Sequence, residues 1–235
     1  MGGAGAIAPA PCLLSGRAHW GIAGTVSPSH QDMMSDPHAP DSTASPEHLL
    51  DAGLARHRAG DLAGAARCYH LALQRAPDLA RGWHLLGLTH AQAGDAADAT
   101  ALITRALTLD PGHAEAHTDL ANLHHRAGQT AQAIASYRAA IAADPTLAKA
   151  WSGLGAALLA SGDHAGAIAA WREALAIDPG LIAVQYDLGC ALHHSGHFDD
   201  AAAAYRAVLA RQPRHRHARG KLNEALIAQT PRGPS

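Results

Sequence analysis

The sequence predicts an all-α protein, a right-handed α-α superhelix in which helix–turn–helix units stack into a solenoid. Two columns of residues repeat with a period of 34, and a fixed period of this length indicates a repeat architecture. Glycine recurs at Gly60, Gly94, Gly128, Gly162 and Gly196. Proline recurs at Pro77, Pro111, Pro145, Pro179 and Pro213. Aromatic residues make up only 4% of the chain, so alanine carries much of its 48% apolar content and favours helix strongly.

Each column has a role in a pair of helices. The glycine lies between the two helices of a unit, where a helix end needs a residue that tolerates positive φ. Each proline disfavours helix in the residue before it and therefore ends the second helix. The residue after the glycine begins that second helix, and Asp is a good N-cap. These expected N-caps are Asp61, Asp95, Gln129 and Asp163.

Small and bulky residues occupy separate columns. Small residues in the first and second helices, as at Gly87 and Ala99, allow the two helices of a unit to touch. A bulky column is expected to fill the space between successive units. Its members are Tyr69, Ile103, Tyr137, Trp171 and Tyr205.

The repeated stretches carry a family resemblance. "WHLLGLTH" begins at Trp83 and "WSGLGAAL" at Trp151, while "AIASY" and "AIAAW" end at Tyr137 and Trp171. This pattern resembles the tetratricopeptide repeat (TPR) family, whose 34-residue unit reads W-x₂-L-G-x₂-Y, then A-x₃-F, then P. The tryptophan position departs from the pattern in three units, where looser packing is expected. The residues there are Leu49, His117 and Gln185.

The repeats divide the chain into four parts. Five units are predicted over residues 46–213, as 46–79, 80–113, 114–147, 148–181 and 182–215. A capping helix is predicted over residues 214–230, because Leu222 and Leu226 lie one helical turn apart and a solenoid needs its open end covered. Residues 1–45 and 231–235 are predicted to be disordered. Met33 or Met34 is a candidate for the true start, with residues 1–32 as an upstream extension.

Composition narrows the functional class. The net charge of −2 gives no global reason to expect nucleic acid or a membrane surface as partner. The three cysteines are far apart and form no CxxC motif, which favours a reducing, cytoplasmic compartment. No run of 18 apolar residues exists, so no membrane span is expected, and the N-terminal stretch makes a poor signal peptide. The alanine-, histidine- and arginine-rich composition is typical of a bacterium of high GC content.

The resemblance implies a protein–protein interaction adaptor or scaffold, which would bind a partner segment in a groove lined by the first helices. No enzyme activity and no cofactor is expected. Tyr186 is the expected anchor, because interface energy concentrates in aromatic and Arg residues. The predicted groove residues are Arg81, His84, Leu88, Thr118, Asp119, Asn122, His125, Lys149, Ser152, Tyr186, Asp187, Cys190 and His193.

Two other functional classes stay open. One is an accessory module of an enzyme system such as an O-GlcNAc transferase-like glycosyltransferase. The other is a metal or pH sensor built on "CALHHSGHFDDA", where Cys190 and His194 share a helix face and His193 lies beside them. Solvent-facing histidines are the simpler interpretation, because the 18 histidines mostly occupy variable columns. No phosphate-binding loop and no nucleophile elbow is present.

The stretch "RQPRHRHARGK" near the C-terminus is basic, with Arg211, Arg214, Arg216, Arg219 and Lys221. Such a cluster suits an acidic partner or a phosphate backbone. The alternative is a solvated face on the capping helix. The sequence therefore predicts another protein or peptide, rather than nucleic acid, as the partner.

Overall fold

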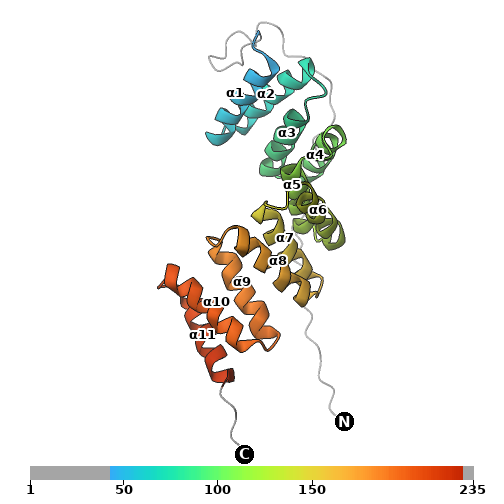
Figure 1. Cartoon of the computed structure of the whole chain (residues 1–235). Coiled ribbons are helices and arrows are strands. Elements are labelled where there is room, and N and C mark those ends of the chain that lie inside the picture. Colours follow the sequence, from blue (N-terminus) through green and yellow to red (C-terminus); the bar gives the residue numbers. More distant parts are fainter. Residues whose placement is uncertain (1–42, 230–235) are drawn as a thin grey trace, which may run out of the picture. The chain divides into compact units, whose positions relative to one another are not determined.

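The computed structural model describes residues 43–229, and all regular structure within them is helical (Figure 1). The predicted all-α solenoid is confirmed. The predictions for residues 1–42 and 231–235, including a start at Met33 or Met34, concern residues outside the described range. The helices are α1 (Pro46–Arg58), α2 (Leu62–Arg75), α3 (Ala80–Ala93), α4 (Ala96–Leu109), α5 (Ala114–Arg126), α6 (Thr130–Ala143), α7 (Ala148–Ala160), α8 (His164–Ile177), α9 (Ile182–His194), α10 (Phe198–Arg211) and α11 (Arg216–Gln229).

The helices pack in pairs along the chain. Each odd-numbered helix from α1 to α9 packs most closely against the helix that follows it, and each pair then contacts the next pair. We call the odd-numbered helices first helices and their partners second helices. Helix α11 begins at Arg216, 34 residues after the start of α9 at Ile182, so it is in register as a sixth first helix. None of the helices between residues 43 and 229 is long and apolar enough to cross a bilayer.

The glycine column ends the first helices as predicted. All five glycines have positive φ, between 74° at Gly128 and 95° at Gly94, a region that other residues occupy only with strain. The backbone N–H of Asp95 then donates to the His90 carbonyl at 2.9 Å, which satisfies one of the carbonyls left over at the helix end.

All four predicted residues stand at the N-cap of their second helix, and two of them also form a side-chain cap hydrogen bond. Asp61 accepts a hydrogen bond from the Gly64 N–H at 2.8 Å, and Asp163 accepts one from the Gly166 N–H at 2.9 Å. Asp95 and Gln129 make no side-chain cap hydrogen bond. The capped helices carry glycine three residues after the cap. A Cβ at Gly166 would lie 2.8 Å from the Asp163 Cγ, so a side chain there displaces the carboxylate.

The bulky column packs against small residues of the first helices. In four units the bulky side chain lies over a glycine in the first helix of its own unit. A Cβ at Gly189, for example, would meet the Tyr205 ring at 2.7 Å. The third unit is the exception, because its first helix carries Ala121 at that position. There the Tyr137 hydroxyl reaches to within 2.6 Å of where a Cβ at Gly153 of the next unit would be.

The tryptophan column contributes a hydrogen bond to the preceding turn. The Trp83 Nε1–H donates to the Pro77 carbonyl at 2.8 Å, and the Trp151 Nε1–H donates to the Pro145 carbonyl at 2.9 Å. His117 keeps the same bond, with its Nε2 3.0 Å from the Pro111 carbonyl oxygen. The exchange of Trp for His therefore preserves the polar contact to the turn, although the smaller ring fills less space.

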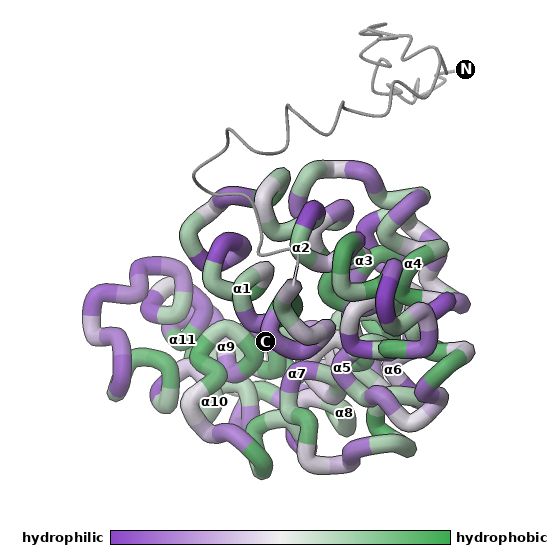
Figure 2. Tube along the Cα trace, turned by 90° about the horizontal axis from the view of Figure 1, so that it is seen from above, coloured by the Kyte–Doolittle hydropathy of each residue, from purple (hydrophilic) through white to green (hydrophobic). Residues whose placement is uncertain are grey.

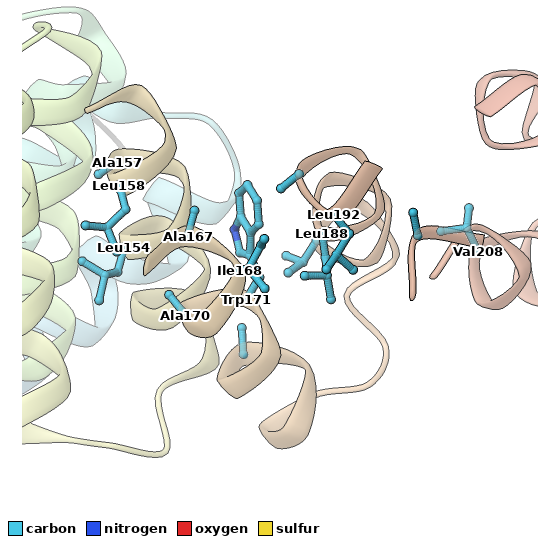
Figure 3. Packing of buried hydrophobic residues seen from close by; sticks show 14 of the residues in the cluster. Leu154, Ala157, Leu158, Ala167, Ile168, Ala170, Trp171, Leu188, Leu192 and Val208 are labelled. Atoms are coloured by element: carbon cyan, nitrogen blue, oxygen red, sulfur yellow. The ribbon is translucent and has the colours of Figure 1, made fainter. Parts of the chain in front are cut away.

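Buried side chains from successive units join into a continuous core. Hydrophobic and hydrophilic residues alternate along the helices (Figure 2), as expected for elements with one buried stripe. In Figure 3 the Trp171 indole lies between leucines of α7, such as Leu154, and leucines of α9, such as Leu188. Trp171 is only 2% exposed, and its Nε1–H donates to the Ser152 carbonyl at 3.1 Å.

Candidate functional site

The first helices form a layer in which contacts join α1 to α3, α3 to α5, α5 to α7 and α9 to α11. Helices α7 and α9 make no direct contacts of this extent. Between residues 43 and 229, no two successive second helices make contacts of comparable extent. All the predicted groove residues lie on first helices. Side chains from neighbouring units are therefore brought together on this layer rather than on the second helices.

The predicted groove residues differ widely in exposure. The exposed ones are Arg81, Asn122, Lys149 and Asp187. The half-buried ones are Leu88, Asp119, His125, Ser152, Tyr186, Cys190 and His193. Two are buried: His84 is 4% exposed and Thr118 is 6% exposed. The Thr118 hydroxyl donates to the Ala114 carbonyl of its own helix at 3.0 Å. Thr118 and His84 therefore contribute to the packing under the layer and not to its exposed surface.

His84 joins α3 to α5. Its Nε2 lies 2.8 Å from the Asp119 Oδ2, and its ring meets the His113 ring edge-on at a centroid distance of 4.7 Å. Desolvation, followed by the nearby His84, lowers the pKa of His113 below its ordinary value. This contact fixes the orientation of the half-buried Asp119 carboxylate on the layer.

Asn122 is fixed by a neighbouring second helix. The Tyr137 hydroxyl donates to the Asn122 Oδ1 at 2.6 Å. Burial is the main cause that raises the pKa of Tyr137 to about 12, with a smaller contribution from the Asp119 charge. The bond occupies the Asn122 carbonyl oxygen, so its amide N–H groups are the donors that remain for a ligand.

Asp119 and Asn122 line a cleft between α3 and α5 with a volume of about 310 Å³. Its lining residues are Leu88, Ala91, Gln92, Ile103, Asp119, Asn122, Leu123 and Arg126. Three of them belong to the predicted groove set. Sequence reasoning missed the other five, including Arg126 at the last position of α5. The repeat columns give no signal for these, because cleft formation depends on how two adjacent units pack.

Tyr186 on α9 lies among aromatic rings of the last helices. Its ring centroid is 5.9 Å from that of Tyr205 and 5.0 Å from that of His215. Desolvation, and then the neighbouring Cys190 thiol, raise the pKa of both tyrosine hydroxyls. Desolvation also raises the pKa of the adjacent Asp187 carboxyl. Tyr186 is therefore a half-buried ring with one face held by its neighbours.

The histidines of the α9–α10 turn point to different neighbours. The His194 ring stacks on His164 at 5.0 Å, and the His193 ring meets Phe198 edge-on at 5.2 Å. Within the part of the chain that the structure describes, no three His, Cys, Asp or Glu side chains are grouped so that they could hold a metal ion.

Known proteins share this arrangement. The family model for the cytochrome c-type biogenesis protein H TPR domain matches residues 61–177, and a tetratricopeptide repeat model matches residues 158–229. The second match extends through α11. None of the curated protein sequences matches the chain.

Solved structures also match. MamA is 28% identical, with 68% of this chain and 94% of MamA covered and a TM-score of 0.63. The TPR protein YrrB, described as having an unusual peptide-binding site, is 17% identical over 73% of this chain and 89% of its own, with a TM-score of 0.62. Pseudomonas aeruginosa pilF is 15% identical over 77% and 89%, with a TM-score of 0.66. The last two show the fold alone. With its 34-residue helix pairs, glycine turns and first-helix layer, the chain belongs to the tetratricopeptide repeat family.

Proposed function

We propose that this protein is an adaptor or scaffold that holds a segment of another protein on its first-helix layer. The cleft between α3 and α5 carries this proposal. It combines the apolar side chains of Leu88 and Leu123 with the polar groups of Asp119, Asn122 and Arg126. Apolar walls with a few placed polar groups are what a site needs to bind a side chain and orient the chain that bears it.

The polar groups of the cleft are held before any partner binds. Asp119 is held by His84, and Asn122 is held by Tyr137. A preformed surface loses little conformational freedom on binding, so more of the contact energy appears as affinity. A partner segment would present acceptors, such as main-chain carbonyls, to the Asn122 amide and to Arg126.

The helices α7 and α9 would extend the binding surface. Lys149 and Ser152 lie on α7, and Tyr186 lies on α9 as a ring already supported on one side. Burying a rigid aromatic ring contributes large contact area at a low cost in side-chain entropy. No cofactor and no catalytic step is part of the proposal. The accessory-module and sensor alternatives stay predictions.

Capture of a partner by paired variants tests the proposal. The bait with a changed first-helix layer carries Asn122→Ala, Arg126→Glu and Lys149→Glu. The matched control carries equivalent changes on exposed residues of second helices, namely Gln132→Ala, Arg105→Glu and Arg138→Glu. We expect the wild-type chain and the control to retain the same partner from host lysate and the first-helix variant to lose it, with all three equally helical. Equal capture by both variants would contradict the assignment of the site.

A further inference from the structure

The positive charge of the chain is concentrated near its C-terminus. Residues 201–235 carry seven Lys or Arg and one acidic residue, whereas residues 1–200 carry 11 Lys or Arg and 19 acidic residues. Four exposed arginines lie at the end of α10, in the turn that follows it and in the first turn of α11. We call this group the arginine surface: Arg211, Arg214, Arg216 and Arg219.

No carboxylate within residues 43–229 pairs directly with this charge. The nearest ion pair in sequence joins Lys221 to Glu224 at 2.7 Å. Arg219 donates instead to the Pro213 carbonyl at 2.8 Å, which places its guanidinium over the turn. Like charges gathered in this way repel one another, and a bound anion relieves the repulsion.

The turn also lacks a carboxylate that three equivalent turns possess. In those turns the residue before the proline is Asp, and its Oδ1 accepts from the backbone N–H two residues later. These bonds measure 3.1 Å for Asp110, 2.8 Å for Asp144 and 2.8 Å for Asp178. The equivalent residue here is Gln212, and the equivalent N–H is that of Arg214. That N–H has no acceptor among the described residues.

An open hollow of about 480 Å³ lies at this turn, lined by Gln212, Pro213, Arg214 and His215. One wall is well supported, because the His215 Nδ1 accepts from the Ala218 N–H at 3.0 Å. The His215 ring also packs on Tyr186. The N–H groups at the start of α11 add partial positive charge on the same side.

We propose that the arginine surface and its hollow dock an acidic segment of a partner protein. One partner carboxylate would take the place that Asp fills in the other turns, accepting from the Arg214 N–H, while further carboxylates pair with the guanidinium groups. Arginine suits this role because its planar fork matches a carboxylate. The site is separate from the cleft between α3 and α5 and does not depend on it.

A short acidic segment fits better than a nucleic acid or a membrane. A long polyanion or a lipid sheet would also face the acidic remainder of the chain, whose repulsion acts over about 8 Å at physiological salt. Base stacking needs exposed aromatic rings, and the tyrosine beside this turn, Tyr186, is half-buried against Tyr205 and His215.

Fluorescence anisotropy with a labelled deca-glutamate peptide tests the proposal on the full chain. We expect the peptide to bind and the affinity to fall as salt rises. Arg214→Glu with Arg216→Glu should raise the Kd at least about tenfold. Gln212→Asp should raise the Kd several-fold while it stabilises the turn, because an internal carboxylate then occupies the position. The control pair Arg105→Glu and Arg138→Glu should stay within about twofold of wild type.

Three results would overturn the proposal. The first is no peptide binding at low salt. The second is an equal loss of peptide affinity in both charge-reversed pairs, which would show that binding depends only on the net charge of the chain. The third is tighter binding, through the same arginines, of a 20-base-pair duplex or of phosphatidylserine vesicles, which would make the surface a nucleic-acid or membrane site. The Gln212→Asp variant keeps the test independent of misfolding.

Discussion

Replacement of Gly189 by alanine should destabilise the solenoid, although alanine favours helix. Gly189 lies inside α9, and a Cβ there would lie 2.7 Å from the Tyr205 Cε1 and 3.0 Å from its Cδ1. The Tyr205 side chain is 0% exposed, so the ring has no free space into which it can move. The added methyl group must therefore displace packed helices.

The magnitude follows from two opposing effects. Overpacking a tight core costs about 1 to 3 kcal/mol. Removing a helical glycine stabilises by about 0.5 to 1 kcal/mol. The net loss in the free energy of unfolding should be about 1 to 2 kcal/mol. Gly220 in α11 is the matched control, because a Cβ there would meet nothing within 4 Å. Gly220→Ala should stabilise by about 0.5 to 1 kcal/mol.

Thermal unfolding followed by circular dichroism at 222 nm measures the difference. For a chain of this size each kcal/mol corresponds to about 2 to 4 °C. Gly189→Ala should therefore melt several degrees below wild type, and Gly220→Ala should melt slightly above it. The packing argument is refuted if Gly189→Ala melts as high as Gly220→Ala, because helix propensity alone would then decide both outcomes.

Three further predictions concern the turn, the buried pair and pH. Gly94→Ala should lower the free energy of unfolding in urea by about 1 to 2 kcal/mol, because φ is 95° at this position. An unchanged free energy of unfolding would contradict the turn assignment. Asp119→Ala should cost about 1 to 3 kcal/mol because it leaves the buried His84 without its partner, and additive losses in a double-mutant cycle would show that the two residues are uncoupled. Burial raises the pKa of Tyr69 and Tyr137 to about 12, so folding favours their neutral hydroxyls. The stability that these two groups contribute is fully present below pH 10 and is lost as the pH rises towards 12. The loss in the free energy of unfolding should reach about 2 to 3 kcal/mol per tyrosine. Absorbance at 295 nm measures the ionisation directly, and titration of every tyrosine near pH 10 would contradict the prediction.

The repeated columns predicted the helices because each column has one local physical role. Glycine at positive φ and proline after the second helix mark every unit in the same way. The start of α11 also follows from the period, since Arg216 lies 34 residues after Ile182. Features that depend on one residue and its own backbone can therefore be derived from the sequence.

Contacts between units are harder to derive. The His84–Asp119 bond joins residues 35 positions apart in columns that vary from unit to unit. The placement of Tyr137 depends on Ala121 in its own unit and Gly153 in the next, and no single column records that combination. The burial of His84 was missed for the same reason, because it follows from the packing of α3 on α5.

Site-specific photocrosslinking tests the central claim most directly. A benzophenone amino acid would replace Lys149, exposed on the first helix α7, and in a second variant Arg138, exposed on the second helix α6. If a partner segment lies on the first-helix layer, the probe at position 149 should crosslink a discrete partner and the probe at 138 should not. A partner that crosslinks from 138, or equally from both positions, would contradict the account.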